Sequence, residues 1–135
     1  MNAQTRTFPS TPDAVTAASS FVLDAAEPLG LSDEVREAML LVVGEAVANA
    51  AGHGNGYDAA KQVTVVCSVA DGEARLCVED EGEGMSADRL DGAALPDDPL
   101  ATSGRGLFIM TTVAERLWLE AGGRRLCLAW THDAS

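Results

Sequence analysis

The stretch EAVANAAGHGN, which runs from Glu45 to Asn55, combines an apolar helical pattern with a polar stripe. Glu45, Asn49 and His53 are spaced four residues apart, and residues with this spacing lie one above another on a helix. Alanine and valine residues flank the stripe and suit burial in a core. The pattern predicts a helix that packs on a core and presents its polar stripe either to a functional site or simply to solvent.

Upstream of this stretch the sequence predicts an edge strand and two helices. Residues Thr5 to Phe8 alternate weakly, as a short edge strand does. Thr11 can cap a first helix that has Pro12 at its first position. After a break at Gly30, a second helix is expected from Ser32 to about Ala51, with acidic residues at its positive end.

Downstream the pattern changes from helical to strand-like. A glycine-rich loop is expected at Gly52 to Asp58, followed by two strands, QVTVVCSVA and ARLCVE, that Asp71-Gly72 joins as a hairpin. GRGLFIMTTVAER, which begins at Gly104, reads as an apolar helix. The chain then continues as RLWLEA, a Gly122-Gly123 turn and RRLCLAW, a second hairpin.

These elements favour an α+β fold. We expect a two-layer sandwich in which a mixed, mostly antiparallel sheet carries its helices on one face. A chain of 135 residues is most simply one domain, residues 1–135, with a substantial core. The aperiodic Pro-, Asp- and Gly-rich stretch within residues 86–105 is expected to be a loop or lid.

Charge and composition exclude several classes of function. With 21 acidic against 9 basic residues the net charge is −12, which disfavours direct binding to nucleic acid or to anionic membranes. No apolar run is long enough to span a membrane. Lys61 is the only lysine, so the phosphate loop G-x-x-x-x-G-K-[ST] is absent. Any nucleotide would have to be bound in another way.

The cysteines and the N-terminus indicate an intracellular setting. Cys67, Cys77 and Cys127 form no C-x-x-C pair, and each lies among apolar residues, so we expect small buried hydrophobic side chains. The N-terminus MNAQTRTFPS lacks the basic start and apolar core of a secretory signal. We expect a cytoplasmic protein.

The motif DEGEG, from Asp80 to Gly84, directly follows a predicted strand. A carboxylate at this position can accept hydrogen bonds from an exocyclic amine, and Gly82 and Gly84 let the backbone pass close to a flat ligand. An acidic turn is the alternative. A calcium loop of the D-x-[DN]-x-[DN]-G type is not met, because Gly82 occupies the third position.

The motif GRGL, from Gly104 to Leu107, precedes a predicted apolar helix. The N–H groups at the positive end of that helix suit phosphate oxygens, Ser103 can cap the end, and Arg105 adds a full charge. A glycine turn into a core helix is the alternative, since a G-x-G before a helix is common.

In this order and spacing the three motifs resemble the Bergerat-type ATP-binding fold of the GHKL (histidine-kinase-like ATPase) superfamily. The N box would be Glu45-x-x-x-Asn49, and the glycine boxes Asp80-x-Gly82-x-Gly84 and Gly104-x-Gly106. EAVANAAGHG looks like the signature of the bacterial anti-sigma factors that are also serine/threonine protein kinases. The likeness spans nearly the whole chain.

The resemblance implies a role for each motif. Glu45 would act on the attacking hydroxyl of a partner protein, Asn49 would ligate Mg²⁺, and Asp80 would bind the adenine amino group of ATP or ADP. His53 would lie in the ATP-side loop, with no defined role. The other nucleotide-binding residues would be Gly54, Gly82, Gly84, Met85, Thr102, Ser103, Gly104, Arg105, Gly106 and Leu107.

One position departs from the family pattern. The family usually has Gly-Thr in its last hairpin, whereas here Arg124 follows Gly122-Gly123. The expected hydroxyl is therefore missing, which puts the detailed phosphate contacts in doubt, although Thr102 or Ser103 can substitute for it.

The function that the resemblance implies is an ATP-dependent serine/threonine kinase that is also an anti-sigma factor. Such a protein holds either a sigma factor or a STAS-type antagonist, phosphorylates the antagonist, and forms a homodimer. The alternatives are a non-catalytic module whose bound nucleotide only sets the lid, or a kinase of a switching pathway without a sigma factor. The presence of Glu45 favours catalysis, because nucleotide binding alone needs no base.

Overall fold

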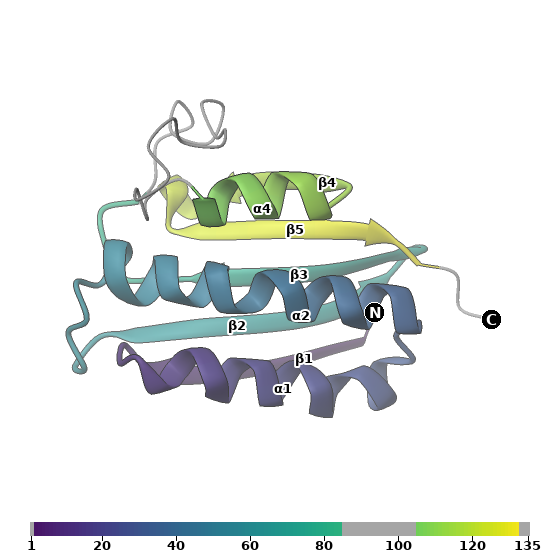
Figure 1. Ribbon diagram of the computed structural model, residues 1–135, viewed down its shortest axis with the longest axis horizontal. Coiled ribbons are helices and arrows are strands. Elements are labelled where there is room, and N and C mark those ends of the chain that lie inside the picture. Colours follow the sequence, from purple (N-terminus) through teal and green to yellow (C-terminus); the bar gives the residue numbers. More distant parts are fainter. Residues whose placement is uncertain (1, 85–104, 133–135) are drawn as a thin grey trace.

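The computed structural model describes residues 2–84 and 105–132, which form a helical layer on one antiparallel sheet (Figure 1). The strands are β1 (Asn2–Pro9), β2 (Gln62–Ala70), β3 (Glu73–Glu79), β4 (Arg116–Glu120) and β5 (Arg125–Thr131). The helices are α1 (Asp13–Leu29), α2 (Asp33–Ala48) and α4 (Arg105–Val113), with a π-helical turn at Asn49–Gly54 and a short 3₁₀ turn at Ala121–Gly123.

The sheet has the order β1-β2-β3-β5-β4, and all four pairings between the described strands are antiparallel. The expected α+β architecture is confirmed, with no parallel pair among these strands. Both predicted hairpins are present. Asp71 and Gly72 have φ values of 53° and 74°, the left-handed conformation that a two-residue hairpin turn requires.

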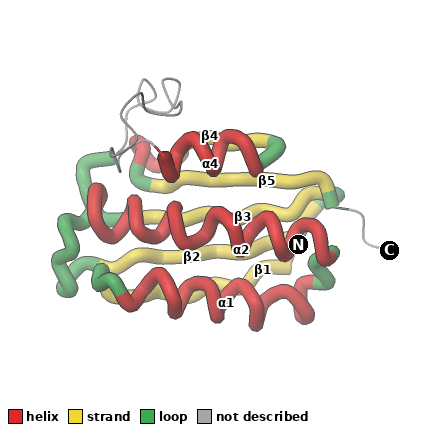
Figure 2. The backbone as a smooth tube through the Cα atoms, in the orientation of Figure 1, coloured by secondary structure: helices red, strands yellow, loops and turns green. Residues whose placement is uncertain are grey.

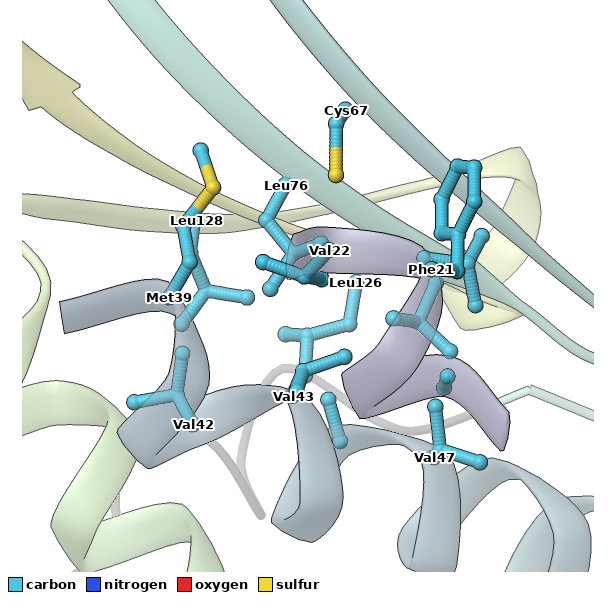
Figure 3. Packing of buried hydrophobic residues seen from close by; sticks show 14 of the residues in the cluster. Phe21, Val22, Met39, Val42, Val43, Val47, Cys67, Leu76, Leu126 and Leu128 are labelled. Carbon is cyan, nitrogen blue, oxygen red and sulfur yellow. The ribbon is translucent and has the colours of Figure 1, made fainter. Parts of the chain in front are cut away.

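Helices α1, α2 and α4 cover the same face of the sheet and run roughly along its strands (Figure 2). Between the layers one hydrophobic cluster joins the helices to β2, β3 and β5. Met39 and Val43 of α2 meet Leu76 and Leu128 of the sheet, and the sulfur of Cys67 points into the same cluster (Figure 3). This packing fixes α2, and with it the polar residues at its C-terminal end, above β3.

The helix ends follow the predicted signals with two exceptions. The Ser32 hydroxyl accepts a hydrogen bond from the Val35 N–H at 3.2 Å, and Gly30, at φ 68°, ends α1, both as expected. The expected side-chain cap at Thr11 is wrong: Pro12 takes the cap position in a helical conformation, with no side-chain hydrogen bond there. The α-helical part of α2 also ends three residues early, at Ala48, because the chain widens into the π-helical turn.

Gly44, within α2, offers a test of how α1 and α2 pack. A Cβ at this residue would lie 3.4 Å from Cγ1 of Val15, an ordinary contact, so Gly44→Ala should raise the free energy of unfolding by about 0.5–1 kcal/mol through helix propensity. Urea denaturation measures the change. Gly30→Ala is the matched control and should be destabilising, because its left-handed φ is costly for alanine. A lower midpoint for Gly44→Ala would mean that Val15 cannot accommodate the methyl group.

Candidate functional site

A pocket of about 580 Å³ opens where the C-terminal end of α2 meets the ends of β3 and β5. Its apolar lining comes from Ala46, Ala50, Val78 and Leu126, and its polar lining includes Asn49, Asp80 and two cationic residues, Lys61 and Arg124. Asn49 of the N box and Asp80 of the first glycine box, about 30 residues apart in the sequence, therefore line one cavity. Of the predicted polar stripe, Asn49 and His53 line the pocket, whereas Glu45 is exposed to solvent beside it.

Asp80 lies directly after β3 and is held from both sides. Its N–H donates to the Arg124 carbonyl at 2.9 Å, and its Oδ1 accepts from the Gly82 N–H at 2.8 Å. A Cβ on Gly54 would lie 2.3 Å from Asp80 Oδ2, so residue 54 must lack a side chain for the carboxylate to occupy this place. The second carboxylate oxygen takes no part in the hydrogen bond to Gly82.

Glycine backbones pack closely around the pocket. A Cβ on Gly82 would lie 2.2 Å from the Gly54 carbonyl oxygen, and one on Gly84 would lie 2.1 Å from the Gly122 carbonyl oxygen. Any side chain at Gly82 or Gly84 would thus collide with backbone, which cannot move aside as a flexible side chain can. These contacts hold the DEGEG loop between the π-helical turn and the β4–β5 turn.

Glu45 lies beside the pocket, against the beginning of α4. A Cβ on Gly106 would lie 2.8 Å from Glu45 Oε2, so the second glycine of the GRG motif packs directly on this carboxylate. The structure thereby brings the N box and the second glycine box together. Asn49 and His53 both line the pocket, and both belong to the π-helical turn that follows the regular helix.

The remaining predicted site residues do not line the pocket in the described part of the chain. Leu107 is buried in the hydrophobic core and does not line the pocket. Arg105 begins α4. Met85, Thr102, Ser103 and Gly104 lie outside the described residues, as does nearly all of the lid predicted at residues 86–105.

Comparison with known proteins gives a family match and similar solved structures, among them one of a mycobacterial protein. A family model described as the histidine kinase-like ATPase domain matches residues 8–130. The chain belongs to this family. A search of curated proteins gives no match.

The solved structure contains the RsbU and RsbW domains of Rv1364c from Mycobacterium tuberculosis. The likeness covers 98% of this chain and 32% of that chain, with 18% sequence identity and a TM-score of 0.64. At this identity the likeness supports the fold, which is the Bergerat type that the sequence predicts. The present chain spans about a third of the length of the Mycobacterium protein.

Membership in the histidine kinase-like ATPase family implies that the chain binds a nucleotide. None of the helices in the described part of the chain is long and apolar enough to cross a membrane.

Asn55 is a site residue that the sequence analysis did not identify. Its side chain is buried and makes three hydrogen bonds: it donates to the Ser10 hydroxyl at 2.8 Å and to the Gln62 carbonyl at 3.0 Å, and it accepts from the Glu81 N–H at 2.8 Å. It therefore ties the DEGEG loop of this ATPase domain to the ends of β1 and β2. The only sequence signal is an asparagine inside a glycine-rich loop, which equally suits an ordinary turn.

The two cationic residues of the pocket are also new. Lys61 precedes β2, and Arg124 stands at the position where the family pattern has threonine. Arg124 supplies the carbonyl that holds Asp80 and a guanidinium that donates to the Ala121 carbonyl at 3.2 Å. The departure from the family pattern thus places a positive charge, and not merely a missing hydroxyl, in the wall of the pocket.

Burial makes the Asp80 carboxylate a source of instability. Desolvation raises the pKa of Asp80, although the hydrogen bond from Gly82 and the charge of Arg124 act in the opposite direction. A carboxyl group whose pKa is raised on folding destabilises the folded state at pH values above that raised pKa. The destabilisation disappears as the pH falls through the folded pKa towards the unfolded value of about 3.9.

Asp80→Asn should therefore melt at a higher temperature than the wild type at pH 7. The amide keeps an oxygen for the Gly82 N–H and removes the charge, and the gain should stay below about 1 kcal/mol because the group is only half buried. Thermal melts from pH 7 towards acid pH should show the difference shrinking. Asp24→Asn is the control, because Asp24 is exposed on α1. It removes one negative charge from the net charge of −12, as Asp80→Asn does, and so measures the gain from reduced repulsion among acidic residues alone. An equal gain in both variants would contradict the burial argument.

Proposed function

We propose that the pocket binds ATP or ADP, with the adenine amino group at Asp80. The proposal is supported by the family match and by the position of Asp80, whose carboxylate lines the pocket and is oriented by the Gly82 N–H. The apolar walls of Val78 and Leu126 suit a flat ring, and Lys61 and Arg124 supply positive charge. An anion entering a protein of net charge −12 depends on such local charges, which act within the Debye length of about 8–10 Å.

Mg²⁺ is the metal ion that the nucleotide would bring. Asn49 would hold it through its amide oxygen, the hard ligand type that Mg²⁺ combines with waters and phosphate oxygens. When bound, the ion neutralises phosphate charge. Asn49 would supply a neutral oxygen ligand, and phosphate oxygens and waters would supply others.

The observation that carries the proposal of catalysis is the contact between Glu45 and Gly106. It puts a carboxylate at the edge of the pocket, beside the helix end that would face the phosphates. Glu45 would accept a proton from, or orient, a serine or threonine hydroxyl of a partner protein. The activity would be that of a serine/threonine protein kinase.

The biological role that we propose is that of an anti-sigma factor in a partner-switching circuit. The chain, residues 1–135, would act as a single cytoplasmic kinase domain within a homodimer. It would hold either a sigma factor or a STAS-type antagonist and would release the antagonist after phosphorylating it. A phosphate group adds a charge of about −1.5 to −2 to the antagonist, which the net charge of −12 repels.

Two alternatives remain open to test. A non-catalytic module would use the nucleotide only to control which partner it holds, and Glu45 would then have no chemical role. A kinase of a switching pathway without a sigma factor would keep the chemistry and change the partner.

Two variants should separate binding from chemistry. Asp80→Asn should weaken ATP binding by about 1.5–3 kcal/mol, because the adenine amine loses its charged acceptor. Glu45→Ala should bind ATP like the wild type, as measured by isothermal titration, and lose phosphoryl transfer by about 10²-fold or more. Glu37→Ala, an exposed change on the same helix, is the control. Unchanged transfer in Glu45→Ala would favour the non-catalytic module.

The partner can be identified by labelling. Purified protein, radiolabelled ATP and a STAS-type antagonist encoded beside this gene should give label on one serine or threonine of the antagonist. Changing that residue to alanine should stabilise the complex with ADP, and changing it to aspartate should weaken it and let a sigma factor bind. Labelling without competition from a sigma factor would support the pathway that lacks one, and no label on the antagonist would contradict the switching mechanism.

A further inference from the structure

The face of the sheet opposite the helices carries two cysteines side by side. Residues alternate between the two faces of a strand, and Leu76, Val78, Leu126 and Leu128 lie in the core between sheet and helices. Cys77 and Cys127, which alternate with them, therefore point to the opposite face. The strand register pairs Cys77 of β3 directly with Cys127 of β5.

Backbone hydrogen bonds identify the kind of pair that these cysteines form. At one end of the β3–β5 ladder the Asp80 N–H donates to the Arg124 carbonyl, and at the other the His132 N–H donates to the Gly72 carbonyl. Hydrogen-bonded and non-hydrogen-bonded pairs alternate along an antiparallel ladder. Cys77–Cys127 lies an odd number of steps from both ends, so it is a non-hydrogen-bonded pair.

This geometry suits a disulfide. In a non-hydrogen-bonded pair the Cα atoms are about 4.5 Å apart and the side chains lie at their closest. Disulfides occur at Cα separations of about 4.4–6.8 Å. The two sulfur atoms can thus be joined across the strands without a change of register.

The surroundings favour a thiolate at Cys77. A hydrogen bond from Cys127 lowers the pKa of Cys77 and outweighs desolvation, and the nearby Arg125 guanidinium lowers it further. The hydrogen bond with Cys77, together with burial, raises the pKa of Cys127. Cys77 retains 6% of its surface exposed and Cys127 none, so Cys77 is the less buried residue of the pair. The polar groups that surround the pair on this face include Arg125, Glu79, Glu120 and Arg75.

We propose that Cys77 and Cys127 are a redox-active pair that a peroxide converts to a reversible cross-strand disulfide. The Cys77 thiolate attacks one peroxide oxygen, the O–O bond breaks, and a sulfenic acid and hydroxide form. The Cys127 thiol then attacks the Cys77 sulfur, an S–S bond forms, and water leaves with the thiol proton. In total two thiols are oxidised and one hydrogen peroxide is reduced to two waters. A dithiol reductant reverses the reaction by exchange.

The position of the pair connects it to the pocket. Cys77 is three residues before Asp80, and Cys127 is three residues after Arg124. Val78 and Leu126, adjacent to the cysteines, line the pocket. A disulfide would therefore fix the separation of the two strands at the base of the site, and this inference holds whatever ligand the pocket takes.

The third cysteine provides an internal control. Cys67 is fully buried on the helix side of β2, within the core (Figure 3), and desolvation raises its pKa to about 12. It lies on the other face of the sheet from the pair. Oxidation of the folded protein should therefore leave Cys67 as a free thiol.

The experiment treats the folded, full-length chain with hydrogen peroxide, alkylates it under denaturing conditions and measures its mass. The reduced protein should take up three alkyl groups and the oxidised protein one. Trypsin places each cysteine on its own peptide, residues 62–75, 76–89 and 126–135, because it cleaves after Lys61, Arg75, Arg89 and Arg125. The expected product is a link between peptides 76–89 and 126–135 that a dithiol removes.

Matched variants decide the outcome. Cys67→Ala should form the same link, and Cys77→Ala should keep two alkylatable thiols after peroxide. Cys127→Ala should keep only one, because the sulfenic acid formed at Cys77 then has no partner thiol with which to form a disulfide. Circular dichroism confirms folding, and Cys77→Ser replaces Cys77→Ala if the latter does not fold. Three alkyl groups on oxidised wild type, a link to peptide 62–75, a link between two chains, or a stable sulfinic acid at Cys77 would each overturn the proposal.

Discussion

The site depends on the close approach of three backbone segments that only glycine permits. The DEGEG loop contacts the π-helical turn through Gly82 and Gly54, and it contacts the β4–β5 turn through Gly84 and Gly122, at distances where any Cβ would overlap a carbonyl oxygen. Because the Asp80 carboxylate fills the space beside Gly54, its direction is set by the same packing. The spacing of the glycines is thus a geometric requirement of the pocket. Asn55 holds the DEGEG loop in place with three side-chain hydrogen bonds.

Much of the fold could be predicted from the sequence because its signals are local. The capping serine at Ser32, the hairpin at Asp71-Gly72 and the alternation in β2 each depend on neighbouring residues. The π-helical turn could not be predicted, because it reflects how Asn49–Gly54 must widen to meet the DEGEG loop. The same limit applies to Asn55 and Lys61, whose positions in the pocket depend on segments that are distant in the chain. The resemblance of the motifs to a known family was enough to predict that Asp80 and Asn49 lie in one pocket.

In the proposed function, binding and stability would make opposite demands on one carboxylate. Removing Asp80 from water disfavours its charged form, yet the charged form would be the stronger hydrogen-bond acceptor for an adenine amine. The fold compensates in part with the Gly82 N–H and the Arg124 charge. A threonine at position 124 would supply no charge to Asp80, whereas Arg124 lines the pocket and its charge favours the ionised form of this half-buried carboxylate.

The two faces of the sheet surround their cysteines with different kinds of side chain. On the helix side Cys67 packs among aliphatic side chains and contributes only apolar surface to the core. On the opposite face Cys77 and Cys127 lie beneath a layer of ion pairs in which Glu73 holds Arg75 and Arg116, both stacked near the Trp118 ring. These charges are largely exposed, so they add little stability, but they surround the thiols with guanidinium groups. The three cysteines therefore have different surroundings, and only Cys77 has a lowered pKa, because strand alternation determines which side chains lie next to each of them.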